Sequence, residues 1–427
     1  MALGGARILR AGTVKNVGAM GALSHIRVLD LSRVLAAPWA TQILGDLGAE
    51  VIKIEKPGEG DETRHFGPPF VTAPDGTTAD ATYFLAANRN KKSVAIDFAQ
   101  PEGAALVRRL ARRAHVVVEN FKTGTLARYG LDYETLCADN PALVYCSLTG
   151  FGHDGPRKHK AGYDYLIQGM GGLMSVTGQP DGTPGAEPMK VGVAVSDLVS
   201  GLYTAIAILA ALLHQARTGE GQPIDMALFD CQAAALANQA TNYLAGKMLP
   251  TRLGNAHPNI VPYQVFAVAD GHLILAVAND RQFASFARAA GVPEFACDPR
   301  FATNAARVAN RETIIGLLEP ILRARGLTDW IARLEAANVP CGPINRIDQV
   351  FADPQAIARA LTVSMAHPDA GDLKLVASPV RLARTPPEYR LPPPRLGQHT
   401  MDVLCKDLGL RSEEISALAA KKIVQIA

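Results

Sequence analysis

Several features that would direct this chain toward a particular class of protein are missing from its sequence. The 43 basic and 40 acidic side chains nearly cancel, and the net charge of +3 is spread over scattered residues. The tightest basic cluster, Arg108, Arg109, Arg112 and Arg113, indicates the solvated face of one helix. A nucleic-acid binder would show a basic stripe or patch. The sequence therefore predicts no nucleic-acid partner.

Cysteine is scarce, and the cysteines do not form pairs. Six of them are spread widely over 427 residues without any CxxC spacing. This pattern argues against a disulfide framework and against a structural zinc site. It predicts a reduced compartment, and we expect the cytoplasm and no metal.

Long hydrophobic runs are also missing. The longest, Gly201 to Leu213, is shorter than a bilayer requires, so no membrane partner is expected. The first nineteen residues contain Arg7, Arg10 and Lys15 but no acid and no apolar stretch of a secretory signal. We expect residues 1–22 to be an N-terminal extension. The alternative is a transit segment, which would place the protein in the mitochondrial matrix.

The glycine fingerprints of nucleotide-binding proteins are absent as well. The turn after the first strand candidate runs from Ser32 to Pro38 without a GxGxxG, and no GxxxxGK[ST] occurs. These absences disfavour a nicotinamide-dependent reductase and the common form of nucleoside triphosphate hydrolysis.

The sequence does contain alternating strand and helix patterns. A chain of this length predicts two domains. Apolar strands mostly separated by helices predict an α/β fold, a Rossmann-like large domain with a parallel sheet and a smaller α/β domain. The expected strands are 26–32, 49–55, 93–98, 115–121 and 142–147, with helices at 38–47 and 102–113. The expected parts are a large domain at 23–225, a linker helix at 226–250, a small domain at 251–338 with a hairpin turning at Asp270-Gly271, and a return to the large domain at 339–427.

The longest mostly apolar stretch of the chain is Lys190 to Gln215, which reads KVGVAVSDLVSGLYTAIAILAALLHQ. We expect a strand or extended segment at Val191–Val195, followed by a helix that is apolar on nearly every face and therefore buried. Asp197 falls in its first turn. One interpretation is a simple N-cap. The other is a nucleophile that the helix dipole keeps ionised near pH 7.

Polar and cationic groups collect near the predicted strand ends, where ligands of parallel sheets bind. They suit an anionic ligand with a flat base. For each cation alone, simple surface solvation is the alternative. The groups are Lys53, Lys56, Arg64, Asn88 to Lys92, Asn120, Phe121, Lys122 and Arg128, and Tyr163 and Asp164 open a later helix.

Taken together, several stretches resemble the class III CoA-transferases, also called the CaiB/BaiF family. The similarity runs from about Ser24 to the end of the chain. It is carried by VLDLSRVLAAPWATQILGDLGAEVIKIEKPGEGDETR, NRNKKSVAIDF, VVVENFKTGTLARYGL, AGYDYLIQGMGGLMSVTG, VGVAVSDLVSGLY, TGEGQPIDMALFD, VPCGPIN and LGQHT. Within the family, GPPF, NRNKKS, NIVPYQVF and PPPRLGQHT are most similar to the succinyl-CoA:glutarate-type dicarboxylate transferases.

The resemblance implies that Asp197 is the nucleophile and forms an aspartyl-CoA thioester by way of mixed anhydrides. It implies that Val34, Leu35 and Ala36 line the thioester end of the CoA site. Lys56, Ile96, Asn120, Phe121, Lys122 and Arg128 would hold the nucleotide and phosphates, with Tyr163 and Asp164 toward the pantetheine. Coenzyme A is then a substrate, no cofactor is bound permanently, and two chains form an interlocked homodimer.

Departures from related families narrow the reaction. Formyl-CoA transferases have a glutamine where Leu35 stands and a glycine-rich loop where this chain has GNAHPNIVPY, which argues against oxalate and formyl-CoA. His257, Asn259 and Tyr263 would instead contact a longer acid, or His257 is a surface residue. An α-methylacyl-CoA racemase would have a histidine at Tyr163, and a tyrosine is a poor base at neutral pH. A non-catalytic CoA-binding protein is the alternative from another class.

Overall fold

The structure is a computed structural model that describes residues 21–73, 76 and 78–427. Most of the expected extension at 1–22 lies outside the described residues. The described chain divides into two compact units. The first comprises the described residues up to Ile167, Val195–Cys231 and Leu361–Ala427, and the second comprises Gln168–Ala194 and Gln232–Ala360. Each unit is thus built from separate pieces of sequence, whereas the sequence pattern predicts boundaries near 250 and 338.

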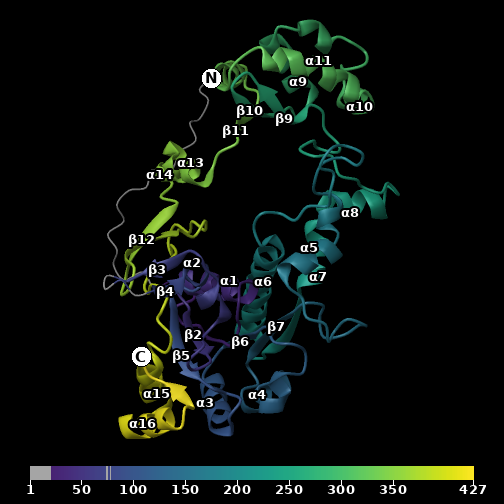
Figure 1. Cartoon of the computed structure of the whole chain (residues 1–427). Coiled ribbons are helices and arrows are strands. Elements are labelled where there is room, and N and C mark those ends of the chain that lie inside the picture. The colour runs from purple at the N-terminus through teal and green to yellow at the C-terminus, as the bar shows by residue number, and fades with distance from the viewer. Residues whose placement is uncertain (1–20, 74–75, 77) are drawn as a thin grey trace, which may run out of the picture. The chain divides into compact units, whose positions relative to one another are not determined.

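A seven-stranded sheet forms the centre of the first unit (Figure 1). Its order is β14-β5-β2-β1-β6-β7-β8, and all neighbouring strands are parallel except β14, which runs antiparallel to β5. This confirms the predicted α/β class with a mainly parallel sheet. The strands are β1 Arg27–Asp30, β2 Glu50–Glu55, β5 Lys91–Ile96, β6 Val116–Glu119, β7 Val144–Thr149, β8 Gln222–Ala227 and β14 Val424–Gln425.

The direction of strand order reverses at β1, because β2 and β5 follow on one side of it and β6, β7 and β8 on the other. Ligands of open parallel sheets bind beside such a reversal, at the carboxyl ends of the strands. We therefore expect a ligand site among the segments that follow β1, β2, β5 and β6.

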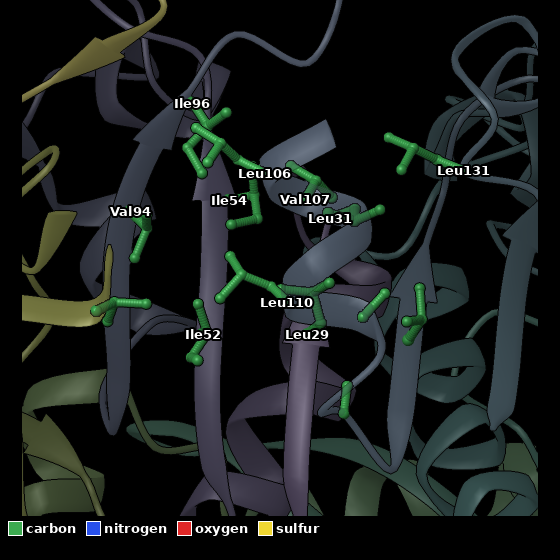
Figure 2. Packing of buried hydrophobic residues seen from close by; sticks show 14 of the residues in the cluster. Leu29, Leu31, Ile52, Ile54, Val94, Ile96, Leu106, Val107, Leu110 and Leu131 are labelled. Carbon is green, nitrogen blue, oxygen red and sulfur yellow. The ribbon is translucent and has the colours of Figure 1, made fainter. Parts of the chain in front are cut away.

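Apolar side chains on both faces of the strands explain why the sheet is covered on both sides. On one face, Leu29, Ile52 and Val94 pack against helix α3, Pro101–Ala111, through Leu106, Val107 and Leu110 (Figure 2). Burying one leucine of this kind stabilises the fold by about 1.5–3 kcal/mol. On the other face, Val28, Val51, Val116 and Val144 pack against α1, Ala36–Asp46, and α6, Val195–Thr218.

The C-terminal segment belongs to the first unit. The β14 strand pairs with β5, and Val403, Leu404 and Ile415 of α15 and α16 join the core on the α3 face. The other elements of this unit are η1 Glu62–His65, β3 Phe70–Thr72, β4 Thr78–Ala81, α2 Thr82–Ala86, η2 Leu126–Tyr129, α4 Tyr133–Asp139, β12 Thr362–His367, β13 Gly371–Val376, α15 Thr400–Leu408 and α16 Ser412–Ala420. Helices α5, Asp164–Met170, and α7, Leu228–Ala235, begin in this unit and end in the second.

The helix predicted after Val195 is present as α6, but the prediction that every face is buried is wrong for the single chain. Leu202, Ile206 and Leu213 are 49%, 61% and 70% exposed. Of the helices that the structure describes, α6 is the one whose length and composition would let it cross a membrane, and half of its most apolar window is buried. The helix extends beyond the apolar run from Gly201 to Leu213, so the run alone underestimates its length.

Three local predictions also differ from the structure. The segment before α6 forms no strand at 191–194. The linker helix expected at 226–250 is two helices, the second of which ends at Leu244, with Ala237 in a left-handed conformation (φ 46°) at the break. The β8 strand was not predicted because Pro223 disfavours a strand, and it is tolerated because β8 lies at the sheet edge.

The second unit has its own core around a small antiparallel sheet, ordered β11-β10-β9. The predicted hairpin is confirmed, but Val268 pairs with Gly271, so the turn residues are Ala269 and Asp270. The elements are η3 Leu173–Ser175, α8 Ala237–Leu244, β9 Tyr263–Val268, β10 Gly271–Ala276, α9 Asp280–Ala290, η4 Pro293–Ala296, α10 Asn304–Ala309, α11 Arg311–Arg323, α12 Leu327–Ala336, β11 Cys341–Pro343, α13 Ile347–Ala352 and α14 Pro354–Ala358.

Candidate active site

A large pocket opens in the first unit at the carboxyl ends of the central strands. Its volume is about 570 Å³. The segments after β1, β2, β5 and β6 line it, as expected at a reversal of strand order. The lining includes Ser32, Arg33, Lys53, Lys56, Asp61, Glu62, His65, Phe66, Ile96, Asp97, Phe98 and Phe121.

A smaller pocket of about 120 Å³ adjoins it. Arg33, Glu62 and Phe121 line both pockets, so the two share a wall. The smaller pocket contains Asp197 together with Val34, Leu35, Ala36, Asn120, Lys122, Lys158, Lys160 and Tyr163. A ligand bound in the larger pocket therefore has a short path to a carboxylate.

Asp197 lies in the first turn of α6 and is 8% exposed. It does not need to cap the helix, because the Asp164 carboxylate accepts hydrogen bonds from the backbone N–H of Ser196 at 2.8 Å and of Asp197 at 3.3 Å. This arrangement overturns the interpretation of Asp197 as a simple N-cap. Its side chain is left to face the smaller pocket.

The protonation of Asp197 also differs from the sequence prediction. Burial and, after it, the nearby negative charge of Asp164 together raise the pKa of Asp197 to about 7. The prediction that the helix start keeps the group ionised at pH 7 is therefore only half correct. At that pH the neutral and ionised forms coexist, and a carboxylate with so high a pKa is a better nucleophile than a free aspartate.

The backbone beside Asp197 is held in an unusual conformation. Val34 has φ 68°, in the left-handed region that a β-branched residue rarely adopts. Its N–H donates to Asp61 Oδ1 at 3.2 Å, and Asp61 pairs with the buried Lys53 at 2.9 Å. Asn120 accepts from the N–H of Arg33 at 2.8 Å and donates to its carbonyl at 2.7 Å. These contacts offset the roughly 1–3 kcal/mol that such a conformation costs.

A shielded carboxylate, a constrained backbone and an adjoining larger pocket thus meet in one part of the first unit, within the residues that match a known family. A model described as CoA-transferase family III matches residues 23–400. The chain belongs to CoA-transferase family III. It is therefore an enzyme that uses CoA thioesters, as the resemblance in the sequence predicts.

Its relatives in CoA-transferase family III extend over nearly the whole chain. It is 52% identical over 384 residues to the succinate–glutarate CoA-transferase of Agrobacterium fabrum, covering 90% of this chain and 95% of the relative. It is 41% identical over 402 residues to the succinyl-CoA:glutarate CoA-transferase of Homo sapiens, covering 94% and 90%. The crystal structure of a CaiB/BaiF family protein from Brucella suis matches with a TM-score of 0.79 and 49% identity, covering 90% and 98%.

The structure brings most of the family-implied residues to the two pockets. Lys56 and Ile96 line the larger pocket, Phe121 lines both, and Val34, Leu35, Ala36, Asn120, Lys122, Tyr163 and Asp197 line the smaller one. Asp164 acts through the start of α6. Arg128 lies exposed on η2 and lines neither pocket. The role of each of these residues in binding CoA stays a prediction.

Several cations that the sequence suggested for an anionic ligand are buried in ion pairs instead. Arg64 pairs with Glu55 and Asp80, Arg89 with Asp46, and Lys91 with Asp30. Asn88 to Asn90 precede β5, and Lys91 and Lys92 begin it. They therefore lie at the amino ends of the parallel strands, whereas the larger pocket lies at the carboxyl ends. Their collective assignment to the ligand is therefore wrong, and these charges neutralise internal carboxylates.

Sequence reasoning missed a second group of pocket residues: Arg33, Glu62, His65, Phe66, Phe98, Lys158 and Lys160. Arg33 forms an ion pair with Glu62 and its guanidinium lies 4.8 Å from the centroid of the Phe121 ring. The sequence position of Arg33 and Glu62 could have predicted them, because Arg33 follows β1 and Glu62 follows β2 within a few residues. Glycine-rich sequence around Lys158 and Lys160 gave no such indication.

The remaining expectations concern metals and the second unit. Within the described ranges, no group of three or more histidine, cysteine or acidic side chains could hold a metal ion. All six cysteines are free. His257 Nδ1 accepts from the N–H of Asn259 at 3.1 Å, and its ring centroid lies 5.2 Å from that of Tyr263. Whether these three residues contact an acid stays a prediction.

Proposed function

We propose that this enzyme moves CoA from succinyl-CoA to glutarate through covalent intermediates on Asp197. The observation that carries the proposal is the position of Asp197, a shielded carboxylate in a small pocket that adjoins one of about 570 Å³. The larger pocket suits the nucleotide end of CoA, since it combines Lys56 with apolar Ile96, Phe98 and Phe121. The names of the relatives at 41–52% identity support the choice of donor and acceptor.

The reaction needs no net proton transfer. The Asp197 carboxylate attacks the thioester carbonyl of succinyl-CoA, the C–S bond breaks, and a mixed anhydride and CoA thiolate form. The thiolate then attacks the aspartyl carbonyl and releases succinate, which leaves an aspartyl-CoA thioester. Glutarate attacks that carbonyl, the thiolate leaves again, and its return to the glutaryl carbonyl gives glutaryl-CoA and free Asp197. Covalent catalysis thus divides one difficult exchange into several easier steps.

The architecture supports two parts of this cycle. The thiolate must stay in place while the anhydride exists, and a CoA nucleotide anchored in the larger pocket would keep it close, which makes its return effectively unimolecular. Leu35 lies in the pocket with Asp197 and offers no hydrogen bond, in contrast to the glutamine of formyl-CoA transferases. An apolar side chain there can pack against the methylene groups of a longer acyl chain.

We also propose that the first unit is Rossmann-like and that the enzyme is a homodimer. The sheet order, read along the chain as 3-2-1-4-5-6 before β14 is added, is that of dinucleotide-binding sheets. Leu202, Ile206 and Leu213 leave an apolar face of α6 uncovered in the single chain, and a second chain would bury it. Light scattering after size-exclusion chromatography tests the dimer, and a monomeric mass would reject it.

The test of the function is an assay of the purified enzyme with a panel of CoA donors and free acids. We expect the highest kcat/KM for succinyl-CoA with glutarate, and lower values with oxalate or with monocarboxylic acids. Asp197→Asn should abolish transfer and retain CoA binding. Turnover by that variant at the native rate would reject the mechanism, and preference for another acid would reject the substrate assignment alone.

A further inference from the structure

A buried acid, Glu119, ends β6 two residues before Phe121, which lines both pockets. Glu119 is 5% exposed, and its side chain forms two hydrogen bonds. Oε2 accepts from the backbone N–H of Phe121 at 2.7 Å, and Oε1 accepts from the hydroxyl of Ser147. Among the ion pairs of the described residues, none involves Glu119. The carboxyl group is therefore buried without a cation.

Such a carboxyl group costs stability when it is ionised. Burial raises the pKa of Glu119 to about 7, although the bonds from Ser147 and Phe121 counteract part of that effect. A glutamine has nearly the same shape, could form both hydrogen bonds and would carry no charge. The acid thus contributes nothing to packing that an amide would not, and it differs only in the strength and the titration of its bonds.

The segment that Glu119 holds contributes to both pockets. Asn120 binds the backbone of Arg33 on both sides, as described above. Phe121 lines both pockets and packs edge-on against Phe98, with ring centroids 5.7 Å apart. A hydrogen bond to the N–H of Phe121 therefore fixes the wall that the two pockets share.

Glu119 is also connected to the surface. Ser147 Oγ lies 2.8 Å from Nε2 of His153, whose side chain is partly exposed. The backbone N–H of His153 donates to the Asp225 carboxylate at 3.0 Å, and its Nε2 lies 4.0 Å from the same carboxylate. The neighbouring strands present few other charges to Glu119. On β7, Tyr145 shares its face and donates to the carbonyl of Leu131, and Cys146 points to the other face.

On β1, alternation along the strand directs Leu31 toward the face of Glu119 and Asp30, which is paired with Lys91, toward the other. The route from Glu119 to solvent through the described residues therefore runs by way of Ser147 and His153.

We propose that Glu119 is a positioning residue of the CoA pocket: its carboxylate form holds Asn120 and Phe121 in the binding conformation, and Ser147 and His153 connect it to solvent. The inference rests on the CoA-binding function of this site. The charged carboxylate makes a stronger bond to the N–H of Phe121 than the neutral acid does. Uptake of a proton turns Oε1 into a donor to Ser147 Oγ, and the Ser147 hydroxyl then turns from Glu119 toward Nε2 of His153.

The experiment measures the Kd of free CoA by titration calorimetry between pH 6 and pH 8.5, which requires no turnover. For a group with a pKa of about 7, the ionised fraction falls roughly tenfold from pH 8 to pH 6, and the affinity should fall up to tenfold with it. Glu119→Gln should bind CoA about 3–10-fold more weakly than the native enzyme at pH 8. Its remaining pH dependence is that of Asp197 and the CoA phosphates, which both forms of the enzyme share.

Two further variants separate this role from a structural one. Ser147→Ala removes a hydrogen bond that lowers the pKa of Glu119, so the pH at which affinity falls should move upward. Tyr145→Phe removes a buried hydroxyl from the same face of β7 without touching Glu119, and it should keep the native pH profile.

Equal Kd values for the native enzyme and a folded Glu119→Gln at every pH would overturn the proposal. An unshifted profile in Ser147→Ala would overturn the connection through Ser147. If the native enzyme shows no transferase activity with succinyl-CoA and glutarate but all variants bind CoA as expected, the proposed substrates are rejected and the role of Glu119 is supported.

Discussion

The carboxylate of Asp164 accepts a hydrogen bond from the backbone N–H of Asp197, at 3.3 Å, and a shorter one from the preceding residue at 2.8 Å. One acid therefore caps the helix that carries the other. The cap orients the first turn of α6, and its negative charge, after burial, is the second cause of the raised pKa of Asp197.

The two effects of Asp164 can be separated by two substitutions. Asp164→Asn keeps a capping side chain but removes the charge, so it should lower the pKa of Asp197 and move the acidic limb of the kcat/KM profile to lower pH. Asp164→Ala removes the cap as well and should cost about 0.5–2 kcal/mol of stability in urea unfolding. An acidic limb that stays in place in Asp164→Asn would show that the charge of Asp164 does not reach Asp197.

Activity should depend on pH through Asp197 itself. The nucleophile is the ionised form, and the pKa of about 7 means that this form is lost as the pH falls below 7. We expect kcat/KM to level off above pH 8 and to fall about tenfold per unit well below pH 7. A profile measured at saturating acceptor checks this. Constant activity from pH 5 to pH 8 would contradict the shielded position of the carboxylate.

The buried pair of Lys53 and Asp61 should be essential for stability near the site. Both side chains are fully buried, and Lys53 Nζ lies 2.9 Å from Asp61 Oδ2. Asp61 also accepts a hydrogen bond from the N–H of Val34. Lys53→Met leaves an unpaired buried carboxylate and should cost about 3–5 kcal/mol. Lys92→Met, which breaks a partly exposed pair with Glu50, is the matched control and should cost less than about 1 kcal/mol. Similar losses in both variants would refute the distinction.

Arg33 should affect binding rather than chemistry. Its guanidinium pairs with Glu62 and packs on Phe121 where the two pockets meet. Arg33→Met should raise the KM for succinyl-CoA by about 3–10-fold, because a charged contact and a cation–π contact are lost, with kcat changed less than about twofold. Arg113→Met removes an exposed arginine away from both pockets and should change neither constant. A kcat effect confined to Arg33→Met would assign it to the reacting end instead.

Much of the first unit could be predicted from sequence, because buried parallel strands appear as short apolar runs. The runs around Val28, Ile52 and Val117 were all found within a few residues of their observed bounds. Asp197 was found because an acid at the start of a long apolar helix is conspicuous. The strand containing Pro223 was missed because edge position, which makes a proline acceptable, is a property of the sheet and not of the local sequence.

The roles of charged residues were harder to predict. Sequence shows that Arg64 and Lys91 are cations, but it does not show that Glu55 and Asp30 lie opposite them in the folded chain. The same limit applies to the pKa of Asp197, since burial depends on the packing of distant segments. The cap provided by Asp164, 33 residues earlier in the chain, was likewise not predicted.

The formation of a covalent bond between Asp197 and the acyl or CoA group is the central claim, and trapping tests it most directly. The enzyme is incubated with succinyl-CoA, treated with hydroxylamine and analysed by peptide mass spectrometry, with Asp197→Asn as the control. We predict a hydroxamate on Asp197 that requires succinyl-CoA and is absent from the variant. Modification at another residue, or none in an enzyme that turns over normally, would contradict the account.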